Sequence, residues 1–118
     1  MNRFTTLIAS CAMALFLSTG AYAADPVVTP EQIAAARTSA DHEAIAAIFD
    51  QEAARLEQKV KEHEKMAQSY RSTTAGTKGA NAAAMSAHCL KLSTQYAAAA
   101  KENRELAKEH RAMKDRSM

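Results

Sequence analysis

Five side chains that could ligate a soft metal ion fall within two short stretches of the sequence. Within each stretch, the later side chains follow the first one by three or four residues, so on a helix all of them would project to one side. They are His63, Met66, Met85, His88 and Cys89. Thiolate and thioether sulfur combined with imidazole suit copper, Cu+ in particular, whereas histidine and cysteine alone would also suit zinc. We therefore expect a metal site here, with copper as the preferred ion.

A second and sparser set of candidate ligands lies nearer the two ends of the same region. His42 and His110 would supply imidazole, with Met113 one helical turn after His110 and carboxylates at Asp41, Glu43 and Glu109. His42 precedes His63 by 63 minus 42, or 21 residues, which is roughly 30 Å along a helix. The two sets would therefore be separate sites, and we expect the second to be the weaker one.

These side chains can meet only if two long helices fold back on one another. Residues 40–72 and 80–114 contain no internal Gly or Pro and are rich in good helix formers. Residues 73–79 carry two glycines and three threonines, which is typical of a turn. Before them, Thr29 is a predicted N-cap with Pro30 at the first helical position, which predicts a short helix ending near Arg37.

Each long helix contains a heptad pattern in alternating steps of three and four. The predicted seam of the first helix consists of His42, Ile45, Phe49, Glu52, Leu56, Lys59, His63, Met66 and Tyr70. That of the second consists of Met85, Cys89, Leu92, Tyr96, Ala99, Asn103, Leu106, His110 and Met113. Reversal at Gly76 makes the numbers of opposed residues add up to 152. This register places His42 opposite His110 and His63 opposite Cys89.

The expected fold is therefore all-α: an antiparallel helical hairpin with a short N-terminal helix. Its core would be thin, because aromatic residues make up 5% of the chain and only about 15 larger apolar side chains lie within the hairpin. Such a core needs support. We expect dimerisation into a four-helix bundle, docking of the short helix, or a bound ion or cofactor to provide it.

The first 23 residues have the pattern of a cleaved secretory signal. Arg3 precedes an apolar run from Phe4 to Leu17, and Ala21-Tyr22-Ala23 is a small-x-small cleavage pattern. Residues 24–118 would then form one exported domain, periplasmic or secreted, with no membrane insertion. Cys89 would be its only thiol, open to an intermolecular disulfide, to metal binding or to burial. Processing before Cys11, which would leave that residue lipidated, is the alternative.

Several other functions find less support in the sequence. A net charge of +2 with interspersed acidic and basic residues argues against nucleic-acid binding, and no oxyanion hole, phosphate loop or substrate cavity is recognisable, so we expect no enzyme. A b-type haem would need an apolar slot that this alanine-rich seam lacks. The main alternative is a metal-free chaperone, adaptor or structural interaction protein. In that interpretation the methionines fill the core and Cys89 is a small buried residue.

The sequence also resembles a family of small, alanine-rich exported helical proteins that carry a M-x-x-H-C motif. The resemblance covers nearly all of residues 24–118. It rests on Asp41-His42, Glu62-His63, Met85-x-x-His88-Cys89, Tyr96 and His110-Arg111. It implies an exported helical fold, and it brings no activity with it.

Overall fold

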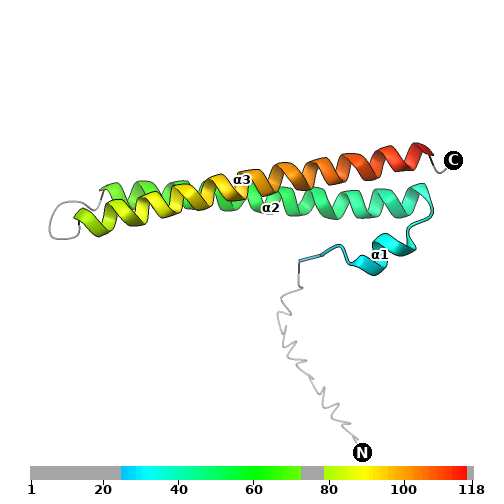
Figure 1. Ribbon diagram of the computed structural model, residues 1–118, viewed down its shortest axis with the longest axis horizontal. Coiled ribbons are helices and arrows are strands. Elements are labelled where there is room, and N and C mark those ends of the chain that lie inside the picture. Colours follow the sequence, from blue (N-terminus) through cyan, green and yellow to red (C-terminus); the bar gives the residue numbers. More distant parts are fainter. Residues whose placement is uncertain (1–24, 73–78, 117–118) are drawn as a thin grey trace, which may run out of the picture.

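Two long antiparallel helices and one short helix form the described part of the chain. The computed structural model describes residues 25–72 and 79–116, and the side chains of 25–72 and 81–113. These residues form α1 (Pro30–Ala35), α2 (Ser39–Ser72) and α3 (Gly79–Arg116), and none of them forms a strand. α2 and α3 lie side by side, and α1 lies beside the end of the hairpin where α2 begins (Figure 1). The predicted all-α hairpin is thereby confirmed.

Several sequence predictions concern residues outside the described ones. They are the cleaved signal at 1–23, the lipidated Cys11 and the reversal at Gly76. None of the helices in the described part of the chain is both long and apolar enough to cross a lipid bilayer.

The first two helices each begin at a capping box, the first of them at the predicted N-cap Thr29. At α1, Gln32 N donates to Thr29 Oγ1 at 3.2 Å, and Thr29 N donates to Gln32 Oε1 at 2.8 Å. At α2, Thr38 Oγ1 accepts from Asp41 N at 3.1 Å, while Asp41 Oδ2 accepts from Thr38 N and Arg37 N, both at 2.9 Å. Side-chain oxygens therefore satisfy backbone N–H groups that have no partner within the helix. α1 ends at Ala35, two residues earlier than expected.

Small side chains form half of the interface between α2 and α3. One heptad position of α2 holds Ala46, Ala53 and Ala67, which have no exposed surface, and the half-buried Val60 between the last two. The corresponding buried positions on α3 are Ser86, Ser93, Ala100 and Ala107. Larger half-buried or buried residues alternate with them, including Phe49 and Leu56 on α2 and Tyr96 on α3.

This arrangement corrects part of the predicted seam. Most predicted positions are buried or half-buried as predicted: His42, Ile45, Phe49, Glu52, Leu56, Lys59, His63, Tyr70, Cys89, Tyr96, Ala99, Asn103 and His110. The remaining predicted positions, Met66, Met85, Leu92, Leu106 and Met113, are 39–45% exposed, and on α3 the small buried residues lie one position after them. The physical reason is helix separation: alanine and serine in the seam let the two backbones approach closely, and larger side chains there would hold them apart.

The hydrogen bond from Ser86 Oγ to the Ala67 carbonyl oxygen shows how close the backbones are. It spans 3.0 Å and joins a short side chain of α3 directly to the main chain of α2. Two helices can exchange such a bond only when little side-chain volume separates them. The core is correspondingly thin, because no large side chain among the described residues is fully buried.

Candidate functional site

His42 and His110 meet across the hairpin at the end where α2 begins and α3 ends. Their Nδ1 atoms are 3.2 Å apart, and their ring centroids are 5.4 Å apart. His42 is half-buried and His110 is 7% exposed. The prediction that these residues face each other is confirmed. Two imidazole nitrogens from residues 68 apart in the chain thus converge in a largely buried place.

The surroundings of His110 keep its ring in place and favour its neutral form. Phe49 stacks on the imidazole, with ring centroids 5.7 Å apart and planes inclined by 28°. Burial lowers the pKa of His110, and the nearby charge of His42 lowers it further. A neutral imidazole is the form that hydrogen-bonds across the seam and the form that ligates metal ions.

His63 occupies a second aromatic layer farther along the hairpin. Its ring stacks on Tyr96, with centroids 5.2 Å apart and planes inclined by 27°. His63 Nδ1 is buried and has no hydrogen-bond partner among the described residues. Cys89, which the register places opposite His63, is 8% exposed and carries a free thiol. A buried nitrogen without a partner costs free energy and calls for an explanation, such as a bound ion.

The other candidate ligands of the main predicted site lie toward solvent. Met66 is 40% exposed, Met85 is 45% exposed, and His88 is exposed as well. Within the part of the chain that the structure describes, no three side chains of His, Cys, Asp or Glu come close enough together to hold a metal ion. Of the five candidate ligands, His63 and Cys89 therefore remain in the seam.

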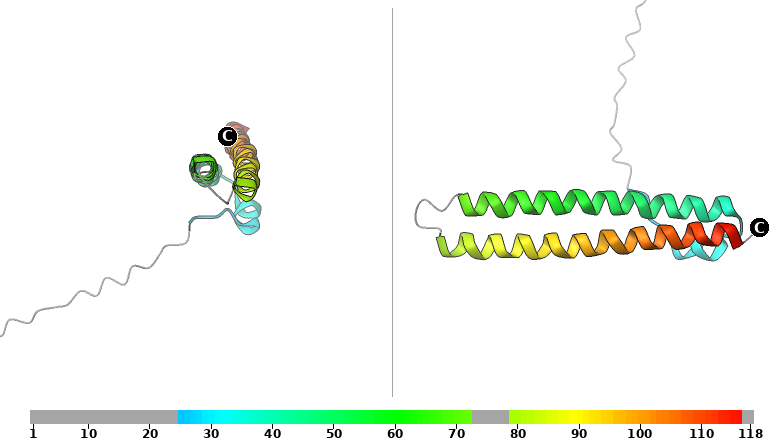
Figure 2. Two further views of the ribbon diagram at one scale, coloured as in Figure 1. Left: turned by 90° about the vertical axis from the view of Figure 1, so that its left-hand side faces the viewer. Right: turned by 90° about the horizontal axis from the view of Figure 1, so that it is seen from above.

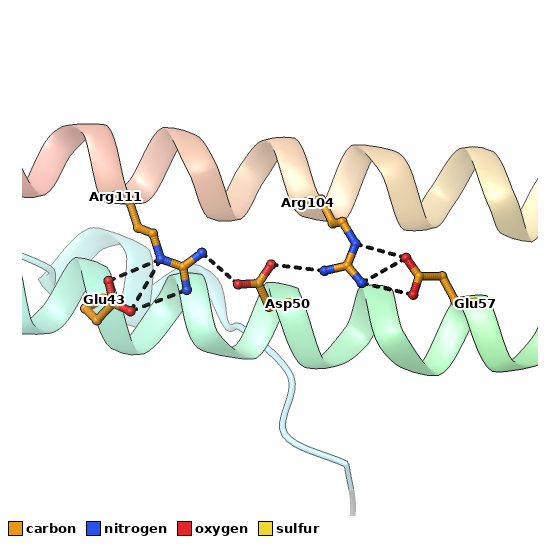
Figure 3. A network of polar contacts seen from close by, with 5 residues as sticks. All are labelled: Glu43, Asp50, Glu57, Arg104 and Arg111. Carbon is orange, nitrogen blue, oxygen red and sulfur yellow. Dashed lines mark hydrogen bonds and ion pairs between the residues drawn. The ribbon is translucent and has the colours of Figure 1, made fainter.

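A row of ion pairs on one flank of the hairpin connects the helices (Figure 3). Arg111 contacts Glu43 at 3.3 Å and Asp50 at 2.7 Å. Arg104 contacts Asp50 at 3.6 Å and Glu57 at 2.8 Å. The guanidinium groups of α3 thus alternate with the carboxylates of α2, and each guanidinium bridges two carboxylates. Glu43 and Arg111, which form one of these pairs, directly follow His42 and His110 in the chain.

Sequence reasoning missed this row, although its signal was present. Acidic residues recur every seventh position at Glu43, Asp50 and Glu57, and arginines do so at 104 and 111. Like spacing of opposite charges on two antiparallel helices predicts pairing along one flank.

The opposite flank of α3 is apolar rather than charged. Met85, Leu92, Leu106 and Met113 follow one another at multiples of seven residues, and each is 39–45% exposed. An exposed apolar row of this kind is typical of a surface that contacts a partner. The view from above shows α1 at the end of the hairpin where α2 begins (Figure 2).

Comparison of the chain with protein-family models, curated protein sequences and solved structures finds no match.

Proposed function

We propose that the protein is an exported helical hairpin that binds a transition-metal ion, with copper preferred, between His42 and His110. Such a protein would buffer, deliver or sense the ion. The observation that supports this proposal is the separation of 3.2 Å between the two Nδ1 atoms. For metal–nitrogen bonds of 2.0–2.1 Å, two nitrogens bound to one tetrahedral ion lie about 3.3 Å apart. The two rings need little movement to share an ion.

The donor types around this pair favour copper. Imidazole binds copper, zinc, iron and nickel, and thioether sulfur adds a preference for Cu+. Met113 follows His110 by three residues, so both side chains lie on the same side of α3. With two imidazoles from the protein, the coordination sphere is open, and thioether or water would complete it. Such an open site suits transfer of an ion to another molecule better than permanent structural binding.

Anaerobic titration of the purified protein with Cu+ against a competing chelator tests the proposal. We expect His42→Ala and His110→Ala each to weaken binding of the ion held by this pair by about 100-fold or more, since a direct ligand matters at least as much as the groups that orient it. His88→Ala is the matched control, because it removes an exposed histidine and leaves the pair intact. A titration curve for His42→Ala that equals that of wild type in both affinity and number of ions bound would overturn the proposal.

The apolar flank of α3 favours a second candidate, a metal-free interaction protein that meets a partner, or a second copy of itself, along Met85, Leu92 and Leu106. This candidate predicts no measurable Cu+ affinity in the same titration. It also predicts association that depends on protein concentration when no metal is present.

A further inference from the structure

The pattern K-E-H-x-x-M occurs twice in the chain, once in each long helix. The first copy spans residues 61–66 in α2 and the second spans 108–113 in α3. Their offset is 108 minus 61, or 47 residues, and the same offset relates the Ser-Ala pairs at 39–40 and 86–87. α2 and α3 therefore carry related patterns, although they run in opposite directions in the hairpin.

The aromatic contacts show that this offset corresponds to a symmetry of the fold. Adding 47 to the residue number leads from Phe49 to Tyr96 and from His63 to His110. His110 stacks on Phe49 at 5.7 Å and 28°, and His63 stacks on Tyr96 at 5.2 Å and 27°. A local twofold axis that exchanges the two helices relates these layers. The histidine of each motif has the same kind of environment, on opposite helices.

The same operation identifies the partner of His63. In the first layer, His110 Nδ1 faces His42 Nδ1 at 3.2 Å. Adding 47 to 42 gives 89, so Cys89 stands to His63 as His42 stands to His110. The equivalent nitrogen, His63 Nδ1, is the buried atom without a hydrogen-bond partner, and the thiol of Cys89 is buried and free. In the layer of His63 and Cys89, a nitrogen without a hydrogen-bond partner and a free thiol therefore occupy the positions that the two Nδ1 atoms occupy in the layer of His42 and His110.

We propose that His63 and Cys89 form a second metal centre, related to the His42–His110 centre by the local twofold axis and selective for soft Cu+. Binding deprotonates the Cys89 thiol, the proton passes to solvent, and thiolate sulfur and imidazole nitrogen bind the ion. Met66 follows His63 as Met113 follows His110, so each histidine has a methionine three residues after it on the same helix. The thiolate makes the second centre the softer of the two.

This inference extends the proposed function, and its test lets either centre fail alone. The purified protein is equilibrated anaerobically with excess Cu+, dialysed against a competing chelator and analysed for copper per chain. We expect two ions in wild type, one in His42→Ala, one in Cys89→Ser and none in the double variant. Retention of two ions in Cys89→Ser overturns the second centre, and retention of two in His42→Ala overturns the first. His88→Ala, the exposed neighbour of Cys89, retains two.

A second measurement monitors the thiol directly. Alkylation of Cys89 by iodoacetamide, measured by peptide-resolved mass spectrometry, is expected to slow about 10-fold or more when Cu+ is bound. His63→Ala removes this protection and His42→Ala leaves it intact. Helical circular dichroism establishes that each variant is folded. Full protection in folded His63→Ala would show that Cys89 binds copper without His63, and it would overturn the paired centre.

Discussion

Replacing Ala53 by leucine tests the small-residue seam, which determines how close the two helices lie. Ala53 has no exposed surface. Ala53 lies opposite Ala100 in the same register that places Ala67 opposite Ser86, because the residue numbers of the two pairs add up to the same total. The Ser86 side chain donates a hydrogen bond of 3.0 Å to the backbone carbonyl oxygen of Ala67. The space opposite Ala53 is thus closed by the backbone of α3, and three additional carbon atoms must separate the helices.

Overpacking of a closed interior position costs about 1–3 kcal/mol, and we expect the upper half of this range because a rigid helix cannot yield locally. For a domain of this size that corresponds to a fall in Tm of roughly 10–20 °C. Thermal unfolding followed by circular dichroism measures it. Ala54→Leu is the control, because Ala54 is exposed and leucine forms helices almost as well as alanine. Equal Tm values for the two variants would refute the inference that small residues in the seam determine how close the helices lie.

Two further predictions concern the charged groups. Arg111→Ala breaks the contacts with Glu43 and Asp50, so we expect a lower Tm at low ionic strength, with the difference shrinking near 1 M salt, where the Debye length is about 3 Å. Hydrogen bonds from the backbone N–H groups of Arg37, the larger cause, and Thr38 lower the pKa of Asp41 below its ordinary value of 3.8. At pH values above 3.8 the ionised carboxylate therefore stabilises the start of α2. That stabilisation is lost as the pH falls through the lowered pKa. An NMR titration of the Arg37 and Thr38 amides should show the transition there.

Each of these two predictions has its own control. Lys108→Ala removes a cation whose nearest ion pair is to Glu105 on the same helix at 3.8 Å, and it should leave Tm almost unchanged at every salt concentration. Asp41→Asn keeps the shape of the side chain and removes its titration, so the amide transition should disappear. If the amide transition persists in Asp41→Asn, it arises from another titrating group and the prediction is wrong.

The contrast between the predicted and observed seams shows what periodicity can determine. Every seventh residue from His42 and from Cys89 was placed correctly, because both possible phases of the heptad contain these positions. Which of the neighbouring positions are covered most depends on how closely the helices pack: Ile45, Ala46 and Ala53 are buried, whereas Glu52, Lys59 and Val60 are half-buried. A single helix considered alone carries no information on that separation.

The candidate sites divide in the same way. Helix spacing was enough to predict that His42 would meet His110, because reversal of the chain fixes the approximate register. Spacing was not enough to place Met66, Met85 and His88, whose orientation depends on which side of each helix faces the other. The structure leaves these three exposed and retains His63 and Cys89 in the seam.

The sequence by itself determined the helices, their starts and their antiparallel pairing, because capping, helix propensity and the glycine-containing turn are local properties. The tertiary structure decided the rest: the phase of the seam, the row of ion pairs and the exposure of the methionines. These depend on the distance and rotation between two helices, which only contacts between residues remote in the chain can fix.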